Sequence, residues 1–231
     1  MVDIHTHLLP EIDDGSPSMD ASIEMVKGEI ANGIKYAIIT PHALRKDMEP
    51  YTLERLRNDF LEFKTKIESE LPIKLYLGQE VYKSDDLIHN LKNKQVLTLN
   101  DSEYVLLELP YQEAPQDLDE IIYACEILGL KIIFAHIERY SYLSIKDIEN
   151  LKKTGVLFQV NSSSFYSRHK YVQKRVHKLF KKKLVSFIAS DIHSYRTNTM
   201  KEAFELVKSK YGEKTANEVF FENAKNLLNI G

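Results

Sequence analysis

Nine side chains of the kinds that bind divalent metal ions recur along this 231-residue chain. They are His5, His7, Asp14, His42, Glu80, Glu108, His136, Asp191 and His193. Imidazole and carboxylate donors without sulfur suit manganese, iron, zinc or cobalt, and the set alone does not choose among these metals. These ligands would hold two or three ions if one carboxylate bridges. Clustered ions clamp an oxyanion and lower the pKa of bound water, which produces hydroxide for attack on phosphorus. The pattern therefore predicts hydrolysis of a phosphate ester.

One ligand spacing is repeated at the two ends of the chain. His5 and His7 are one residue apart, and so are Asp191 and His193. Residues with this spacing on a strand point to the same side, so each pair can hold an ion. Taken alone, the first pair could be strand-end histidines that face solvent. A closed barrel brings its first and last strands together, however, and this favours a shared site.

The middle of the chain supplies the other ligand types, each with a simpler alternative. Glu80 and Glu108 end apolar runs, where a buried carboxylate is costly unless it is paired or bound to a metal, and a salt bridge is the alternative. His42 and His136 could each be a hydrogen-bonded core histidine, but together they supply the missing nitrogen donors. Asp14 could be an ordinary turn aspartate, with the neighbouring Asp13 as the ligand. The sequence leaves this last choice open.

Two arginines follow histidines of the set at the same spacing. Arg139 lies three residues after His136, and Arg196 lies three residues after His193. A guanidinium group matches the geometry of two phosphate oxygens, so both arginines are candidate phosphate ligands. A surface salt bridge is an equally good interpretation of Arg196.

The sequence lacks the residues of other phosphatase chemistries. Cys125 falls on the apolar face of a predicted helix and is followed six positions later by Lys131, so the cysteine-x5-arginine loop of thiol phosphatases is absent. A single cysteine also excludes an intramolecular disulfide and a thiolate-rich zinc site. His89, His169 and His177 follow no apolar run, and we expect them at the surface. Gly-rich phosphate loops and the Gly-x-Ser-x-Gly elbow do not occur.

The candidate ligands follow short apolar runs that alternate with helical segments. The strand-like runs lie near residues 2–4, 35–40, 73–78, 104–108, 131–136, 156–161 and 185–190. A repeated strand and helix unit with ligands at the C-terminal strand ends describes a (β/α) barrel, whose active sites lie on that face. We therefore predict an α/β fold, a distorted (β/α)7 barrel.

Helical segments are indicated by apolar residues at helical spacing. Such stripes begin at Met19, Leu53 and Leu118, and further helices are expected at 170–182 and, as a pair, after residue 197. Ser16 followed by Pro17 predicts the start of the first helix. The glycines before three of the strands, Gly33, Gly129 and Gly155, are predicted left-handed helix C-caps.

Composition limits the other functions. A chain of this length that is 43% hydrophobic fits one domain over residues 1–231. A net charge of -3 with no long basic run argues against nucleic acid or an anionic membrane as the main partner, and we interpret Lys181 to Lys183 as solvated surface. The sequence has no apolar run of membrane-spanning length and no signal peptide, so we expect a cytoplasmic protein. The sequence leaves oligomer formation open.

Together these motifs resemble the polymerase and histidinol phosphatase (PHP) superfamily. The closest resemblance is to the metal-dependent protein-tyrosine phosphatases of bacterial capsule and exopolysaccharide systems. The resemblance spans nearly the whole chain. It is carried by Asp3-Ile4-His5-Thr6-His7-Leu8-Leu9-Pro10 with Ile12-Asp13-Asp14-Gly15, Thr40-Pro41-His42, Gly78-Gln79-Glu80, Leu107-Glu108, Ala135-His136 with Glu138-Arg139-Tyr140, and Ser190-Asp191-Ile192-His193.

The resemblance implies a PHP-type barrel and a division of the ligands among three ions. The first ion would be held by His5, His7, Glu80 and Asp191; the second by Glu80 as the bridge, Glu108 and His136; and the third by Asp14, His42 and His193. It also implies manganese dependence, phosphate binding by Arg139 and Arg196, and a substrate that is the tyrosine-phosphorylated tail of a polysaccharide-assembly kinase.

The chain departs from the family pattern at three places. Glu11 stands where glycine is usual, Ile137 where proline is usual, and the loop after His193 is about two residues short. None of these changes removes a ligand, but the short loop bears on the position of Arg196. Two other functions are alternatives. One is a histidinol-phosphate phosphatase, which would need a small closed pocket with an acidic group. The other is a non-catalytic, metal-bound regulator of a kinase.

Overall fold

The computed structural model describes residues 1–228, and these residues form nine strands whose pairings are all parallel. The strands are β1 (Val2–Thr6), β2 (Tyr36–Ile39), β3 (His42–Ala43), β4 (Lys74–Leu77), β5 (Glu80–Tyr82), β6 (Tyr104–Glu108), β7 (Lys131–Phe134), β8 (Leu157–Asn161) and β9 (Phe187–Ala189). The helices are α1 (Met19–Ala31), α2 (Leu53–Glu70), α3 (Leu87–Lys92), α4 (Leu118–Ile127), α5 (Ile145–Lys153), α6 (Lys170–Lys181), α7 (Met200–Tyr211), α8 (Glu213–Asn217) and α9 (Asn223–Leu228).

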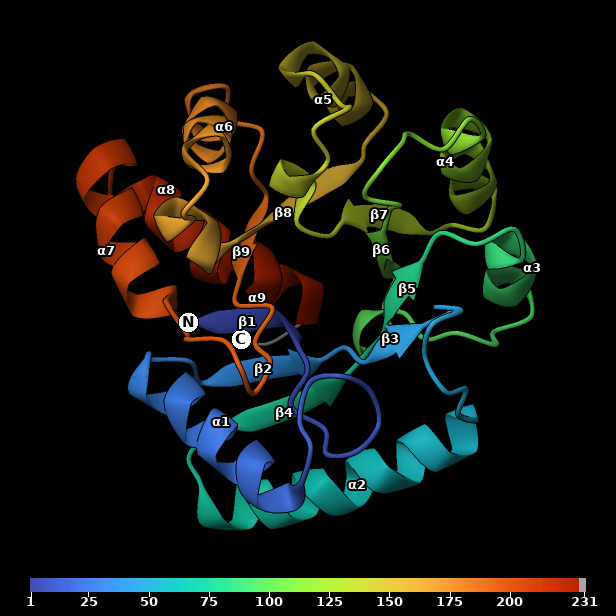
Figure 1. The fold of residues 1–231 in the computed structure, drawn as a ribbon, viewed down its shortest axis with the longest axis vertical. Helices are drawn as coiled ribbons and strands as arrows, with labels where there is room; N and C mark the ends of the chain where they lie inside the picture. Colours follow the sequence, from blue (N-terminus) through green and yellow to red (C-terminus); the bar gives the residue numbers. More distant parts are fainter. Residues whose placement is uncertain (229–231) are drawn as a thin grey trace.

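The strands form a ring with helices around it (Figure 1). One sheet has the order β1-β2-β4, and the other has the order β3-β5-β6-β7-β8-β9. The ring closes between β9 and β1, where the backbone N–H of Asp191 donates to the carbonyl of His5 at 2.9 Å and that of His7 donates to Ile192 at 3.1 Å. The predicted distorted barrel, with its first and last strands adjacent, is therefore confirmed.

Two of the seven predicted strands are each followed by a second, short strand. The run 35–40 contains β2, and β3 begins after Thr40 and Pro41; the run 73–78 contains β4, and β5 begins after Gly78 and Gln79. Pro41 has no N–H for a ladder hydrogen bond. At Gly78 an added Cβ would lie 2.8 Å from Leu99 Cδ2, so only glycine fits this close approach. The seven units are thus correct as chain segments, but the structure has nine strands.

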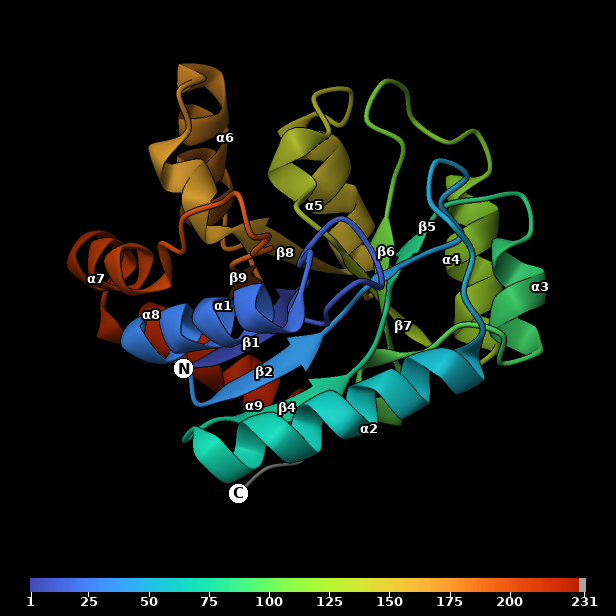
Figure 2. The ribbon, with the colours of Figure 1, turned by 60° about the horizontal axis from the view of Figure 1, so that its bottom comes forward.

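The barrel interior and the helix layer form separate apolar cores. The interior contains Ile4, Ile38, Leu106, Ile133 and Phe187 from the strands. Leu227 and Leu228 of α9 belong to this cluster, so the last helix packs beneath the barrel, as Figure 2 shows. The larger core lies between the strands and the surrounding helices. The apolar interior leaves the other end of the barrel for polar groups.

The first helix begins two residues later than the sequence predicts. It starts at Met19 with Ser18 as its N-cap, and the Ser18 hydroxyl accepts a hydrogen bond from the backbone of Ala21. The predicted start at Ser16 is wrong, because the Ser16 carbonyl accepts from the backbone of Glu11 and so closes the preceding loop.

Other local predictions are confirmed. The apolar stripes face the core, and the three C-cap glycines, Gly33, Gly129 and Gly155, have positive φ. Cys125 is buried, whereas His89, His169 and the lysines at 181–183 are exposed. His177, expected at the surface, is partly buried against α7, and its Nδ1 lies 2.6 Å from the hydroxyl of Tyr211. None of the helices within residues 1–228 is long and apolar enough to cross a membrane.

Candidate metal centre

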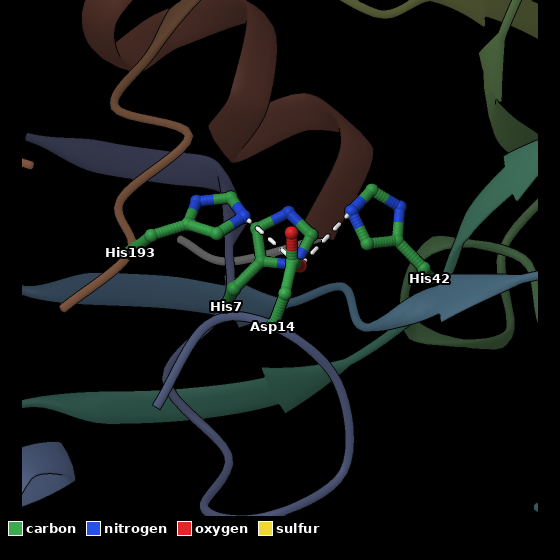
Figure 3. A group of neighbouring side chains, drawn as sticks. All are labelled: His7, Asp14, His42 and His193. Carbon is green, nitrogen blue, oxygen red and sulfur yellow. Dashed lines mark ion pairs between the residues drawn. The ribbon is translucent and has the colours of Figure 1, made fainter. Parts of the chain in front are cut away.

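The nine predicted ligands converge at the C-terminal end of the barrel. The donor atoms of seven of them form three overlapping groups, and within each group the atoms lie within 4.8 Å of one another. The other two, His136 and Asp191, lie beside these groups, 2.8 Å from Glu80 and 3.7 Å from His5. The groups are His5, His7 and Glu80; His42, Glu80 and Glu108; and His7, Asp14, His42 and His193. Figure 3 shows the third group, with the Asp14 carboxylate between the rings of His42 and His193.

The first group is the most deeply buried, and Asp191, from the other end of the chain, lies beside it. The Nε2 atoms of His5 and His7 are 3.2 Å apart. Asp191 Oδ1 lies 3.7 Å from the first of these atoms and 3.6 Å from the second. Donors at about 2.0–2.2 Å from one ion are roughly 3–4 Å apart, so this spacing suits a common ion.

Glu80 occupies the centre of the site. Its Oε2 lies 3.2 Å from His5 Nε2 and 3.0 Å from His42 Nδ1. Its Oε1 lies 2.8 Å from His136 Nε2. Glu108 is farther out, with its Oε1 3.9 Å from the same His136 nitrogen. The two oxygens of Glu80 thus face different sets of donors, as a bridging carboxylate requires.

The two neighbouring aspartates have different surroundings. Asp13 is buried and accepts a 2.7 Å hydrogen bond from His7 Nδ1, and it also accepts from the backbone of Gly15 and of His42. With Nδ1 as its donor, His7 presents the Nε2 lone pair to the site. Asp14 Oδ1 lies 3.4 Å from His42 Nε2, and its side chain is 47% exposed. This geometry favours Asp14 as a ligand and Asp13 as the group that orients His7.

Two buried donor atoms in this site have no hydrogen-bond partner among the described residues. They are Glu108 Oε2 and His42 Nδ1, and the 3.0 Å contact of His42 Nδ1 with Glu80 Oε2 does not have hydrogen-bond geometry. Buried polar atoms are nearly always paired, so each unpaired atom needs an explanation. Both atoms belong to one of the three donor groups, and coordination to a cation would satisfy them. The donor set therefore fits divalent ions.

Electrostatics also favour cations at this position. Burial and the nearby Glu80 carboxylate raise the pKa of Glu108 to about 7. Burial is the largest single effect on His7 and would lower its pKa, but the charge and hydrogen bond of Asp13, together with Glu80, raise the pKa to about 9. Burial would likewise lower the pKa of His42, but Glu80, Asp14 and Glu108 together raise it to about 11. Without ions, protons on these imidazoles balance the carboxylates, so metal binding should release protons.

The two candidate phosphate ligands meet at one oxygen atom. Asp191 Oδ2 lies 3.0 Å from Arg139 Nη2 and 2.6 Å from Arg196 Nη1. The arginine side chains are 28% and 29% exposed, whereas the Asp191 side chain is 3% exposed. Both guanidinium groups thus lie above the donor groups at the mouth of the barrel, and the short loop does not carry Arg196 away from it.

A buried amide pair links three of the ligands and is absent from the sequence-based predictions. Gln159 Oε1 accepts from the backbone N–H of His136 at 2.7 Å and lies 3.3 Å from His5 Nδ1. Its Nε2 donates to Asn161, whose side chain donates to Asp191 Oδ2 at 2.7 Å. Alternation along β8 points both amides into the barrel. A polar inward face between apolar outward residues was the signal that could have revealed them.

Comparisons with known proteins give matches over nearly the whole chain. The model of the family described as "Capsular polysaccharide synthesis, CpsB/CapC" matches residues 1–229. Tyrosine-protein phosphatase CpsB of Streptococcus agalactiae is 30% identical, over 99% of this chain and 98% of that protein. A protein of Staphylococcus aureus named as a putative tyrosine-protein phosphatase, CapC, is 32% identical over 99% of this chain and 91% of its own.

Solved structures give the same result for the fold. A chain from the structures of YwqE from Bacillus subtilis and CpsB from Streptococcus pneumoniae, described as unique metal-dependent tyrosine phosphatases, matches with a TM-score of 0.90 and 28% identity. The match covers 99% of this chain and 94% of that chain. A histidinol phosphate phosphatase from Lactococcus lactis, solved with zinc, histidinol and phosphate, matches with a TM-score of 0.56 at 14% identity and so shares the fold alone.

Proposed function

Because this chain belongs to the CpsB/CapC family, whose curated relatives are tyrosine-protein phosphatases, we propose that it is a manganese-dependent phosphotyrosine-protein phosphatase. The observation that carries the proposal is the convergence of nine imidazole and carboxylate ligands beneath two arginines at one end of the barrel. Cys125 lies outside this site, buried in the core, so the chemistry does not use a thiol.

The proposed ligand assignment divides the nine candidate ligands among three ions. One ion would be held by His5, His7, Glu80 and Asp191; a second by Glu80, Glu108 and His136; and a third by Asp14, His42 and His193. When bound, these ions supply an activated water and neutralise negative charge on the phosphate. Manganese fits the mixed imidazole and oxygen donors, and iron, cobalt and zinc are the other metals to test.

The chain's own side chains bind and orient the substrate in this mechanism. Arg139 and Arg196 point their guanidinium groups at the mouth, where each can donate two hydrogen bonds to phosphate oxygens. Asp191 holds both groups in place and limits their motion before substrate binds. Asp13 keeps His7 in one orientation through its 2.7 Å hydrogen bond. Most of the binding geometry is thus preorganised.

We further propose that the substrate is the phosphorylated tyrosine tail of a polysaccharide-assembly kinase. The description of the family supports a role in capsular polysaccharide synthesis. A phosphotyrosine side chain on a flexible tail can place its phosphate below the two arginines, where the donor groups lie.

A matrix of metals and substrates tests this proposal. Metal-free protein is loaded separately with manganese, iron, cobalt or zinc and assayed with a phosphotyrosine peptide, the matching phosphoserine peptide and histidinol phosphate. We expect the highest kcat/KM with manganese and phosphotyrosine, and loss of activity in chelator. Preference for histidinol phosphate would support the small-molecule alternative. Stoichiometric metal without turnover of any of the three substrates would support the non-catalytic regulator.

A further inference from the structure

Two exposed tyrosines stand beside the arginines at the mouth of the site. Tyr111 follows β6 and is 43% exposed, and Tyr195 follows β9 and is 67% exposed. Both follow the C-terminal ends of their strands, as the candidate metal ligands do. Each ring contacts both a candidate metal ligand and a candidate phosphate ligand, and this position suggests a role in binding.

The first tyrosine contacts one ligand and one arginine. The ring of Tyr111 stacks on that of His136, with centres 5.8 Å apart and planes inclined by 24°. Its hydroxyl accepts a 3.3 Å hydrogen bond from Arg139 Nη1. The ring therefore continues the wall of the site outward from a buried ligand to the arginine layer.

The second tyrosine also contacts one ligand and one arginine. The ring of Tyr195 lies 5.3 Å from that of His193, inclined by 49°. The guanidinium carbon of Arg196 lies 5.3 Å from the centre of the Tyr195 ring. Because the two arginines meet at Asp191 Oδ2, the two tyrosines flank one phosphate-binding position.

The depth of the site determines what each tyrosine can touch. All the candidate ligands except Asp14 are buried, and the arginines are about 28–29% exposed, so a phosphate that reaches the buried ligands lies beneath the arginine layer. The group attached to the ester oxygen then lies at the level of the tyrosine rings. An aryl group can pack there against aromatic faces, and such pairs are favoured beyond simple burial. A serine methylene is too small to contact both walls.

From this arrangement we propose that Tyr111 and Tyr195 form an aryl clamp that makes the enzyme select aryl over alkyl phosphate esters. The inference rests on the proposed phosphatase function and adds to it the residues that determine the substrate class. Each ring acts through its face, and the hydroxyls serve only to position the rings against the arginines.

Aryl and alkyl phosphate esters also differ in leaving group, and this difference changes their rates of hydrolysis. Binding of phosphonates tests the clamp without that difference. We would measure the dissociation constants of phenylphosphonate and methylphosphonate for the manganese-loaded protein by calorimetry. The wild type should prefer the phenyl compound. Tyr111→Leu and Tyr195→Leu should each reduce the ratio of the two constants about 3- to 10-fold, and the double variant should remove most of the preference. Phenylalanine at either position should preserve it.

Tyr123 provides a matched control, because it is 65% exposed on α4, away from the site. Tyr123→Leu should leave the ratio unchanged. Metal content and far-ultraviolet ellipticity should match the wild type in all variants, since both clamp tyrosines lie at the surface. An unchanged phenyl preference in the double variant, with phosphotyrosine still hydrolysed, would overturn the clamp alone. Failure of the wild type to bind either phosphonate or to hydrolyse any phosphate ester would overturn the proposed function as well.

Discussion

Replacing Gln159 by leucine should weaken metal binding although Gln159 is not itself a ligand. Its side-chain oxygen fixes the imidazole of His5 and the backbone of His136, and its nitrogen holds Asn161 against Asp191. Leucine has a similar volume and makes none of these contacts. Loss of a partner that orients a metal ligand typically lowers metal affinity about 10- to 100-fold. We expect a loss on this scale.

The same change should also destabilise the metal-free protein. Three buried groups lose their partner: His5 Nδ1, the backbone N–H of His136 and the side-chain oxygen of Asn161. Each unpaired group costs about 1–3 kcal/mol, so the free energy of unfolding should fall by at least about 3 kcal/mol. Gln79→Leu is the matched control, because Gln79 is a buried amide whose partners are the Leu97 backbone and the Tyr51 hydroxyl. Urea denaturation of the metal-free variants measures this destabilisation, which is expected for both.

Metal affinity separates the two variants. Competition with a calibrated chelator, measured on folded protein, should show the 10- to 100-fold loss in Gln159→Leu and little change in Gln79→Leu. If both variants bind manganese as tightly as the wild type while both lose stability, Gln159 only packs the interior and the reasoning about ligand orientation is wrong.

Three further predictions concern the arginine layer, the thiol and a buried acid pair. Arg139→Ala should keep its metals but lower kcat/KM with phosphotyrosine peptide by about 10²- to 10³-fold. Arg139→Lys should restore part of this loss, and a wild-type kcat/KM in the alanine variant would remove Arg139 from the site. Burial raises the pKa of Cys125 to about 11, so thiol alkylation of native protein and Cys125→Ser should leave activity unchanged, and loss of activity with metals retained would revive a thiol mechanism. Burial raises the pKa of Asp3 to about 6 and that of Glu29 well above its usual value. Stability from this pair is therefore full below about pH 4 and is lost as pH rises, through about 6 for Asp3 and through its own raised pKa for Glu29. Glu29→Gln should therefore flatten the decline in unfolding free energy over that range in urea titrations, and an unchanged slope would contradict this assignment.

The barrel could be predicted from the sequence because its signal is repeated in every unit. Each apolar run ends at a polar residue, and parallel strands place these ends on one face. The two short strands that follow β2 and β4 were harder to predict. Pro41 signals a break because it lacks an N–H, but the need for glycine at Gly78 depends on Leu99, which lies far along the chain and approaches only in the fold. Local pattern carries no information about such a contact.

The ligand types were predictable for the same reason, whereas the groups that orient them were not. Histidine and glutamate at the ends of buried strands are conspicuous, because burial of such groups is costly. Gln159 and Asn161 resemble the exposed face of an alternating strand, and only closure of the barrel shows that this face is internal. Tyr111 lies in a loop without periodicity, and its contacts with His136 and Arg139 arise from tertiary structure alone.

Backbone strain at two of the ligands links the fold to the chemistry. His136 and Asp191 follow β7 and β9 with φ values of 33° and 51°, in the left-handed region that non-glycine residues rarely adopt. Such residues cost about 1–3 kcal/mol each and persist only where surrounding structure determines them. Here the left-handed residue ends the strand and turns the chain, so that Arg139 and Arg196 come back to the same carboxylate. An extended backbone at either position would carry its arginine past the mouth. In the proposed assignment, this strain allows one strand end to supply both a metal ligand and a phosphate ligand.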